Sequence, residues 1–355
     1  MSTPFVTVLI DTYNHQFFIK EAIKSVLSQD FPASEIEILV VDDGSTDDTP
    51  NLVREFEPHV RLLRKANGGQ ASAFNTGIPE ARGRIIAFLD GDDWWTPGKL
   101  TAVTEVFAAQ PDVGLVGHGV TEVYLDGRQR TEVPREVTRF RITSAEDAKA
   151  FRMRRGFLGT SRMAYRRDLL HRIGPVPEAL KFEADEYLFT LAGLFADVVI
   201  LRDAFTFYRL HDKNFFQLTH GDAQAIRRKQ QILAALVQSL RLRFEQCGVP
   251  FEIARTILEC VEVEADILRL VVDSGFPWET VSTELRIMRV FHSDASIWQH
   301  LFSCLRLVPA VVLPARTYYH WRQWLSRLTF YREFRRKVLP FPVPSHVERR
   351  EKQAS

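Results

Sequence analysis

The chain has 355 residues, 45% of them hydrophobic, and its 46 Lys and Arg residues nearly balance 45 Asp and Glu residues to a net charge of +1. These values exclude a disordered chain and a disulfide-stapled mini-protein, and they allow two or three folding units. The charge balance excludes a global attraction to nucleic acid or membrane. Three widely spaced cysteines, Cys247, Cys260 and Cys304, argue against a disulfide framework or a thiolate zinc site, so we expect a reducing, cytoplasmic compartment.

The sequence predicts neither a secretory leader nor a membrane span. The N-terminus lacks a basic region and enters a strand-like run at once. No stretch approaches the roughly 20 apolar residues that cross a bilayer. The most apolar late segment, 307–314, is interrupted by Pro309 and flanked by Arg306 and Arg316. We therefore expect a soluble chain, or one bound to a surface from one side.

The first hundred residues alternate between strand and helix signals. Short apolar runs predict strands at 5–10, 36–41, 60–63 and 84–89. Helical spacing, polar helix starts or small residues predict helices at 14–29, 45–56 and 69–81. This alternation predicts an α/β fold with a mostly parallel central sheet, in which ligands bind at the carboxyl ends of the strands.

The rest of the chain is less regular at first and then helical. Further strands are predicted at 113–116, 121–125 and 198–201, and helices at 144–155, 183–195, 223–247, 251–272 and 277–290. We expect a catalytic domain at 1–218, a helical domain at 219–295, a basic and aromatic segment at 296–340, and a flexible tail at 341–355.

Three polar clusters follow three predicted strands, so their side chains should meet on one rim of the sheet. The clusters are Asp11-Thr12-Tyr13-Asn14, Asp42-Asp43 and Asp90-Gly91-Asp92-Asp93. The carboxylates of the third cluster repel one another, and a hard divalent cation such as Mg²⁺ or Mn²⁺ would relieve that repulsion. The alternative is a solvated acidic turn, which the second acidic pair makes less attractive.

The other clusters also admit a binding role and a structural role. A carboxylate at Asp42 or Asp43 could accept from the imide N–H of uracil or thymine, or from guanine, or it could cap the next helix. Tyr13 could stack on a base, and Asn14 could cap the first helix. The 67–71 loop (NGGQA) could present backbone N–H groups to a phosphate or sugar, although such loops are common.

The order of these motifs resembles glycosyltransferase family 2, whose members have the GT-A fold. The resemblance rests on DTYN at 11–14, VVDDGSTD at 40–47, NGGQASAFNTG at 67–77 and FLDGDD at 88–93, and it covers about residues 4–215. It implies transfer of a sugar, with inversion, from a nucleotide-diphosphate donor. At Asp11 the chain departs from many members, which have proline before Thr-Tyr-Asn.

The resemblance also assigns candidate donor-site residues. It implies that Asp42 or Asp43 contacts the base and that the acidic cluster contacts ribose and a divalent metal, Mn²⁺ or Mg²⁺. Asp92 is the first choice as direct metal ligand, with Asp90, Asp93 and His211 as further candidates, the last from a YRLHDKN segment at 208–214. Arg209 or Lys213 could balance phosphate charge. The remaining donor-site candidates are Thr12, Tyr13, Asn14, Asn67, Gly68, Gln70, Asp90 and Gly91.

On the acceptor side, the segment 182–188 (FEADEYL) resembles the family's general-base segment. Asp185 is the expected base, which would remove the proton of the acceptor hydroxyl, and Glu183 and Glu186 are its rivals. An acidic helix start favoured by the helix dipole is the structural alternative.

Residues 298–340 carry eight Lys and Arg residues against one acidic residue, interleaved with aromatic side chains. This composition suits a helix on an anionic membrane surface, and a helical hairpin packed on the catalytic domain is the alternative. No nucleic-acid module accompanies it, so we expect no nucleic-acid partner.

Together these features predict an inverting, metal-dependent glycosyltransferase that uses a nucleotide-diphosphate sugar, with UDP as the preferred carrier. The acceptor would be a hydroxyl of a saccharide or a lipid-linked saccharide, reached from a position at the inner face of the cell membrane. A nucleotidyltransferase is one alternative, although its glycine-rich basic loop is missing after the first strand. A non-catalytic sugar-nucleotide-binding or scaffold protein is the other.

Overall fold

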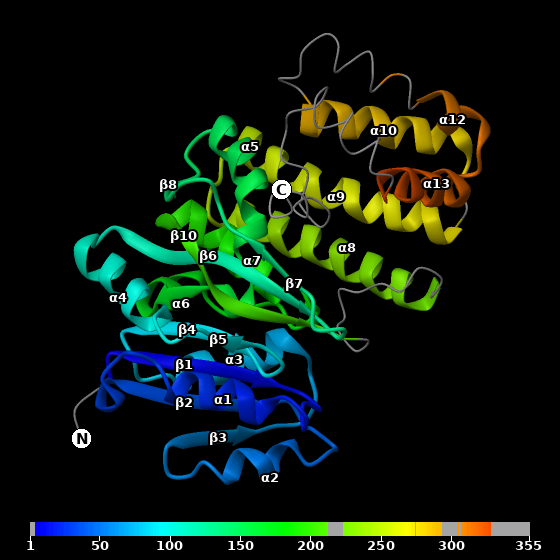
Figure 1. The fold of residues 1–355 in the computed structure, drawn as a ribbon. Coiled ribbons are helices and arrows are strands. Elements are labelled where there is room, and N and C mark those ends of the chain that lie inside the picture. Colours follow the sequence, from blue (N-terminus) through cyan, green and yellow to red (C-terminus); the bar gives the residue numbers. More distant parts are fainter. Residues whose placement is uncertain (1–3, 212–222, 274, 293–303, 305–306, 328–355) are drawn as a thin grey trace, which may run out of the picture. The chain divides into compact units, whose positions relative to one another are not determined.

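The computed structural model describes residues 4–211, 223–273, 275–292, 304 and 307–327 (Figure 1). Contacts divide the chain into two compact units, Met1–Gln217 and Leu218–Ser355, which are described separately. The predicted division of the second part at residues 295 and 340 stays a prediction, and the predicted tail at 341–355 lies outside the described residues.

The first unit is built from alternating strands and helices, with short 3₁₀ turns at Ala33–Glu35, Arg155–Phe157 and Thr160–Arg162. Its strands are β1 Val6–Thr12, β2 Ile36–Asp42, β3 Val60–Arg64, β4 Ile85–Asp90, β5 Trp94–Trp95, β6 Val113–Tyr124, β7 Gln129–Glu132, β8 Thr138–Phe140, β9 Ala164–Arg166 and β10 Asp197–Leu210. Its helices are α1 Ile19–Leu27, α2 Thr49–Arg54, α3 Gln70–Glu80, α4 Lys99–Ala109, α5 Ala145–Arg154, α6 Arg167–Ile173 and α7 Ala184–Phe195.

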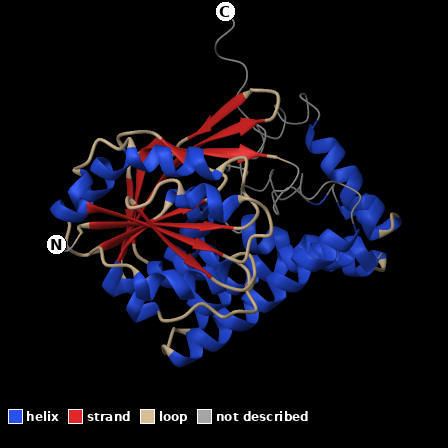
Figure 2. Cartoon of the chain, turned by 90° about the horizontal axis from the view of Figure 1, so that it is seen from below, coloured by secondary structure: helices blue, strands red, loops and turns tan. Residues whose placement is uncertain are grey.

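The strands of the first unit form one twisted sheet, seen as a fan in Figure 2. The order is β3-β2-β1-β4-β9-β6-β10-β5, with β7 beside β6 and β8 beside β10. Strands β3, β2, β1 and β4 are parallel, as are β6 and β10, whereas β9 runs antiparallel between these two groups. The predicted mostly parallel α/β sheet is therefore confirmed.

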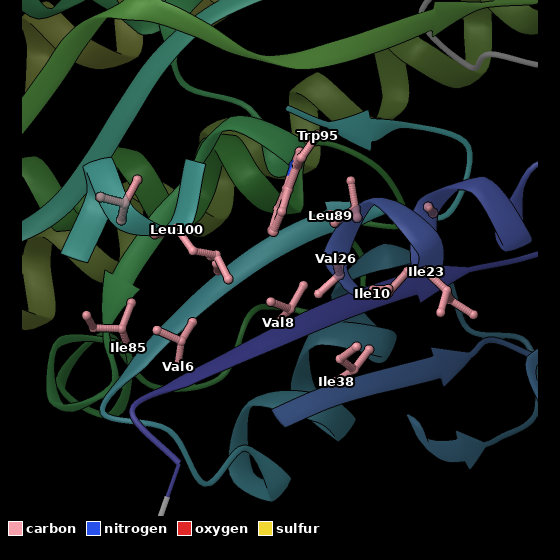
Figure 3. Packing of buried hydrophobic residues seen from close by; sticks show 14 of the residues in the cluster. Val6, Val8, Ile10, Ile23, Val26, Ile38, Ile85, Leu89, Trp95 and Leu100 are labelled. Atoms are coloured by element: carbon pink, nitrogen blue, oxygen red, sulfur yellow. The ribbon is translucent and has the colours of Figure 1, made fainter. Parts of the chain in front are cut away.

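The two faces of β1 are covered by different helices because its side chains alternate. Val6, Val8 and Ile10 belong to one buried cluster with Ile23 and Val26 of α1 (Figure 3). Leu9, on the other face, lies close to Gly77 of α3, and the Phe74 ring of α3 packs 4.8 Å from the Phe88 ring of β4. Burial on both faces explains why these strands read as continuous apolar runs.

Two helices of the first unit are shorter than their sequence patterns predict. Instead of 14–29 and 45–56, the structure has Ile19–Leu27 and Thr49–Arg54. The intervening backbone groups bond across the two loops: Gln16 N donates to Asp47 at 3.2 Å, and Asp48 N donates to Gln16 at 3.1 Å. Cross-loop hydrogen bonds therefore replace the first helical turns.

The strands predicted at 113–116 and 121–125 are one continuous strand, β6, and that predicted at 198–201 extends over all of β10. The glycines inside β6 allow other parts of the chain to pack closely against it. A Cβ at Gly117 would lie 2.5 Å from the Leu158 side chain, and one at Gly119 would lie 2.6 Å from the Glu132 carbonyl oxygen. Glycine here marks a close approach of the chain to the strand.

The second unit is helical within the described residues, as predicted. Its helices are α8 Ala223–Gln246, α9 Phe251–Asp273, α10 Pro277–His292, α12 Leu307–Val312 and α13 Ala315–Arg327. Leu270 of α9 packs with Ala310 of α12 and with Ala315, Tyr318 and Tyr319 at the start of α13. Among the described residues, no helix is long and apolar enough to cross a membrane.

Candidate active site

The carboxyl ends of β1, β2 and β4 bring the three polar clusters together. In the sheet register, Thr12 lies opposite Asp42 and Asp11 lies opposite Asp90. The three clusters therefore share one rim, as the alternation of strands and helices predicts.

Asn14 and Asp42 connect the loops that follow β1 and β2. Asn14 has a left-handed backbone (φ 56°), its N–H donates to Ser45 Oγ at 2.8 Å, and its Oδ1 accepts from Thr46 N at 2.8 Å. Asp42 is fully buried and accepts from Ser45 N and Arg64 Nε, both at 3.1 Å. Asp42 thus braces the turn after β2, while the N-cap position of α2 is occupied by Asp48.

Asp43 holds the glycine loop that begins α3. Its carboxylate accepts from Gly68 N at 3.0 Å, Gly69 N at 2.7 Å and Lys65 Nζ at 2.6 Å, and Asn67 Nδ2 lies 3.2 Å from it. Gly44 makes this approach possible, since it has φ 80° and a Cβ there would lie 2.7 Å from Asn67 N. In this structure the loop N–H groups therefore point to Asp43.

Asp92 lies between two histidines. His211 Nε2 is 3.0 Å and His15 Nε2 is 3.8 Å from Asp92 Oδ2, and the Thr12 hydroxyl contacts His15 Nδ1 at 3.2 Å. The Phe18 ring stacks on His211 with centroids 4.9 Å apart.

Gly91 must be small, because a Cβ there would lie 2.6 Å from the Thr12 hydroxyl. Tyr13 is exposed beside this group, with 38% of its surface accessible.

Asp93 turns away from Asp92 toward buried donors. Its Oδ2 accepts from the Ser161 hydroxyl at 2.6 Å, and its Oδ1 accepts from Arg209 N at 3.0 Å. The Arg209 guanidinium donates to the Asp92 carbonyl at 3.0 Å and lies over the rings of Phe18 and Trp94. The predicted cation Arg209 therefore lies at the acidic cluster, whereas Lys213 lies outside the described residues.

Asp185 lies in the first turn of α7, which starts at a strained residue. Glu183, just before the helix, is buried and has φ 62°, an unusual value for a residue with a side chain. Asp185 Oδ1 accepts from Glu186 N at 2.8 Å, and its Oδ2 accepts from Thr160 N at 3.2 Å. The rival Glu186 forms an ion pair with Arg155. Gln70, from the glycine loop, accepts from Ala184 N at 3.2 Å.

The rim carries more negative charge than its surroundings compensate. Burial, together with the Asp92 carboxylate, raises the pKa of Asp11 to about 8, and burial and neighbouring carboxylates hold the pKa values of Asp90 and Asp93 well above their usual range. Burial would also raise the pKa of Asp92, but His15 and His211 outweigh it and lower that pKa. Burial raises the pKa of Asp185, whose charge in turn acts on Asp11 and Asp90. The acidic cluster and Asp185 therefore share one electrostatic environment.

The rim has donor atoms that suit a divalent cation, although they are not arranged as a closed cage. No group of three or more His, Cys, Asp or Glu side chains among the described residues is placed to hold a metal ion. Both carboxylate oxygens of Asp93 accept hydrogen bonds, from Ser161 and Arg209. Asp11 Oδ1 is buried without a hydrogen-bond partner among the described residues. Hard oxygen ligands and uncompensated charge fit Mg²⁺ or Mn²⁺ completed by phosphate and water oxygens.

Four residues at the rim escape the sequence-based prediction. His15 follows the DTYN motif directly, so its position next to a predicted site loop could have identified it as a site residue. Thr160 and Ser161 lie in a short 3₁₀ turn, and Lys99 starts α4; the sequence gives no periodicity or motif that links them to the carboxylates.

Comparison with known families identifies the class of the chain. Residues 7–174 match the family described as glycosyl transferase family 2. This segment therefore belongs to the family, as the motif order at the four loops indicates.

Curated relatives support the same assignment. The chain is 33% identical over 218 residues to an uncharacterized glycosyltransferase of Nostoc sp., covering 59% of this chain and 66% of that protein. It is 32% identical over 186 residues to the glycosyltransferase AglE of Haloferax volcanii, covering 50% of this chain and 57% of that protein. The matched part thus spans about half to two thirds of the length of these relatives.

Solved structures of similar fold place the first unit in the GT-A class. TarS 1–349 of S. aureus, in complex with UDP-GlcNAc, aligns with a TM-score of 0.52 and 19% identity over 81% of this chain and 89% of TarS 1–349. The mannosyltransferase PcManGT of Pyrobaculum calidifontis, in complex with GDP-Man and Mn²⁺, aligns with a TM-score of 0.52 and 21% identity over 94% of this chain and 83% of PcManGT. The predicted GT-A fold, followed by a helical region, is confirmed.

Proposed function

We propose that this protein transfers a sugar from a nucleotide-diphosphate donor to an acceptor hydroxyl with inversion at the sugar carbon. The observation that carries the proposal is the convergence of Asp92, flanked by His15 and His211, with Asp185 on the rim of a family 2 domain. Nucleotide sugars in TarS and PcManGT support the donor class. UDP is our first choice of carrier.

The donor would bind along the loops after β1, β2 and β4. Tyr13 is exposed and could stack on the base, which Asp42 or Asp43 would read. Both carboxylates already accept protein hydrogen bonds, so base recognition requires an oxygen to exchange a partner or accept a second donor. Thr12, Asn14, Asn67, Gly68, Gln70 and Gly91 would shape the same subsite.

The acidic cluster would hold Mn²⁺ or Mg²⁺ through Asp92, with Asp90, Asp93 and His211 as further candidate ligands. When bound, such an ion neutralises charge on the departing nucleotide diphosphate. His15 and His211 keep Asp92 ionised, because they lower its pKa against the effect of burial. Arg209 donates to the Asp92 carbonyl and to the Asp93 carboxylate, and it adds positive charge at the same edge.

Asp185 would act as the general base. In the reaction, the acceptor oxygen forms a bond to the sugar carbon, the bond from that carbon to the diphosphate breaks on the opposite side, and the hydroxyl proton moves to an Asp185 carboxylate oxygen. Burial raises the pKa of Asp185, which strengthens its carboxylate as a base. The Glu186–Arg155 ion pair supports Asp185 over that rival.

We also propose that the second unit contacts an anionic membrane surface on the cytoplasmic side, where a lipid-linked saccharide acceptor would lie. Within α12, Val308, Val311 and Val312 are exposed, and within α13 Arg316 and Trp324 are exposed. Exposed apolar side chains beside basic ones suit the headgroup region of a bilayer. The other basic residues of the predicted segment lie largely outside the described residues.

The first test is thermal stability with UDP, GDP, dTDP, CMP or NAD, each with and without Mn²⁺. A ligand that binds only the folded state raises the melting temperature by mass action. A metal-dependent rise with one nucleoside diphosphate is expected and would name the base. A rise in melting temperature that is equal with and without Mn²⁺ contradicts the cation assignment. No rise in melting temperature with any nucleotide contradicts the donor class. Turnover with a panel of saccharide acceptors then separates a transferase from a binding protein.

A further inference from the structure

A two-residue segment, Thr160-Ser161, lies between the two groups of carboxylates on the rim. It belongs to the 3₁₀ turn Thr160–Arg162 that precedes β9, and both residues are only 4% exposed. Thr160 contacts the candidate base, and Ser161 contacts the acidic cluster. The two contacts are made by adjacent residues, although Asp93 and Asp185 are far apart in the sequence.

The Ser161 side chain fixes the acidic cluster through one oxygen atom. Its hydroxyl donates to Asp93 Oδ2 at 2.6 Å and accepts from Asp90 N at 3.0 Å, with Asp90 Oδ2 at 3.2 Å. Asp90 and Asp93 therefore share a common contact, which sets the turn that presents Asp92.

The Ser161 carbonyl is held from three directions. It accepts from Trp95 Nε1 at 2.9 Å, Lys99 Nζ at 2.7 Å and Thr206 Oγ1 at 2.6 Å. These donors come from β5, α4 and β10, and Lys99 is fully buried with its Nζ 3.5 Å from the centroid of the Trp95 ring. A carbonyl oxygen has two lone pairs, so three donors leave this peptide little freedom to move.

The Thr160 side chain continues the network to Asp185. The Thr160 backbone N–H and the side-chain Oγ1 lie 3.2 Å and 3.3 Å from Asp185 Oδ2, and Oγ1 accepts from Gln70 Nε2 at 3.0 Å. Gln70 in turn accepts from Ala184 N, at the start of α7. Gln70 and Thr160 thus fix both the helix start and the carboxylate that it carries.

We propose that Thr160-Ser161 is the positioning element that sets the placement of the base carboxylate of Asp185 relative to the donor-side carboxylates Asp90 and Asp93. This inference rests on the proposed function, since it assigns these residues a role in that reaction. Neither residue is proposed to touch the reacting atoms. Because the two side chains serve different carboxylates, their loss has separable effects: Thr160 affects the rate of transfer, and Ser161 affects the binding of the donor.

The test uses the full-length chain, three test substitutions and two control substitutions. Thr160→Val removes the hydroxyl and keeps the shape, Thr160→Ser restores the hydroxyl, and Ser161→Ala removes the contact with Asp90 and Asp93. Thr121→Val and Ser25→Ala are matched controls, since the hydroxyl of Thr121 contacts Thr131 and that of Ser25 contacts Ala22 within α1, and neither contact involves a rim carboxylate. Circular dichroism and melting temperatures verify that each variant is folded.

We expect Thr160→Val to lower kcat by about 10- to 100-fold, the usual cost of losing a residue that orients a functional group, with nucleotide affinity within about twofold of wild type. Thr160→Ser should recover most of that loss. Ser161→Ala should weaken calorimetric binding of the nucleoside diphosphate with Mn²⁺ by about tenfold. The controls should change neither quantity.

Equal kcat in Thr160→Val and wild type, or equal losses in Thr160→Val and Thr160→Ser, would overturn the role of Thr160. Unchanged nucleotide affinity in Ser161→Ala would overturn the role of Ser161. These outcomes leave the proposed function standing, because the wild type remains active. A wild-type chain that neither binds nucleotide nor transfers sugar would overturn both proposals, and it would be recognised before any variant is compared.

Discussion

Carboxylates occur in two contrasting settings in this chain. On the rim of the first unit, Asp11, Asp90 and Asp93 are buried near one another, and burial and mutual repulsion raise their pKa values. Between α9 and α10 of the second unit, carboxylates face arginines: Arg286 bonds Asp266 and, at 3.1 Å, Glu262, while Arg289 bonds Glu259 at 2.9 Å.

The contrast separates charge that is paired within a fold from like charge that is gathered at one edge of a sheet. Along α8 and α9, the pairs Arg227–Asp273 and Arg241–Glu262 run in opposite sequence order, as expected where compensated charges align antiparallel helices. The rim instead concentrates like charge at a cost in stability, which is typical of sites that bind a cation or perform proton transfer. Substitutions in the two regions should therefore have opposite consequences.

The largest effect is expected for Asp185→Asn. The amide cannot accept the acceptor proton, so kcat should fall by about 10²–10⁴-fold, the usual contribution of a general base. Donor binding, measured by calorimetry, should be retained because the acidic cluster is intact. Transfer near the wild-type rate would move the base to Glu183, Glu186 or another group.

Asp92→Asn should act on donor binding. Asn keeps the shape but removes the charge that His15 and His211 sustain, and the affinity for a nucleoside diphosphate with Mn²⁺ should fall by about 10- to 100-fold. Binding measured in EDTA should differ much less between the variant and wild type. An unchanged affinity with Mn²⁺ would remove Asp92 from the metal assignment.

Asp11→Asn should stabilise the protein at high pH. The folded-state pKa of Asp11 is about 8, above the roughly 3.9 of an unfolded chain, so its contribution to stability is complete below about pH 4 and is lost as the pH rises through 8. Without metal, the variant should melt above wild type at pH 8, and the difference should grow between pH 4 and pH 8. At pH 4 the melting temperatures of variant and wild type should converge. A difference in melting temperature that is the same at all pH values would contradict this prediction.

The smallest effect is expected in the helical unit. Arg286→Met removes two partly exposed ion pairs and should lower the free energy of unfolding by about 1 kcal/mol at low salt and less at high salt. Arg255→Met is the matched control, since the recorded ion pair of Arg255 is with Glu252 in the same helix, α9. Donor affinity should be the same in both variants. A gain in stability for Arg286→Met would contradict the contrast between the two regions.

Much of the first unit could be predicted from its sequence because local signals agree with the tertiary fold. The strands at β1, β2 and β4 have apolar side chains on both faces, and their polar ends meet because parallel strands end at one edge. The helix after Ser144 is also predictable, since Ser144 and Asp147 form a capping box at its start. The helix starts near Asn14 and Ser45 were wrong because their backbone groups bond across loops.

The sequence by itself determined the α/β class, which follows from local periodicity, and the order of the acidic motifs, which carries the resemblance to the family. Only the tertiary structure decided that Asp43 holds the glycine loop, that His15 and His211 flank Asp92, and that Thr160-Ser161 bridges Asp93 and Asp185. These contacts join residues that are distant in the sequence and carry no periodic signal. They form because buried polar groups must find partners once the sheet has excluded water.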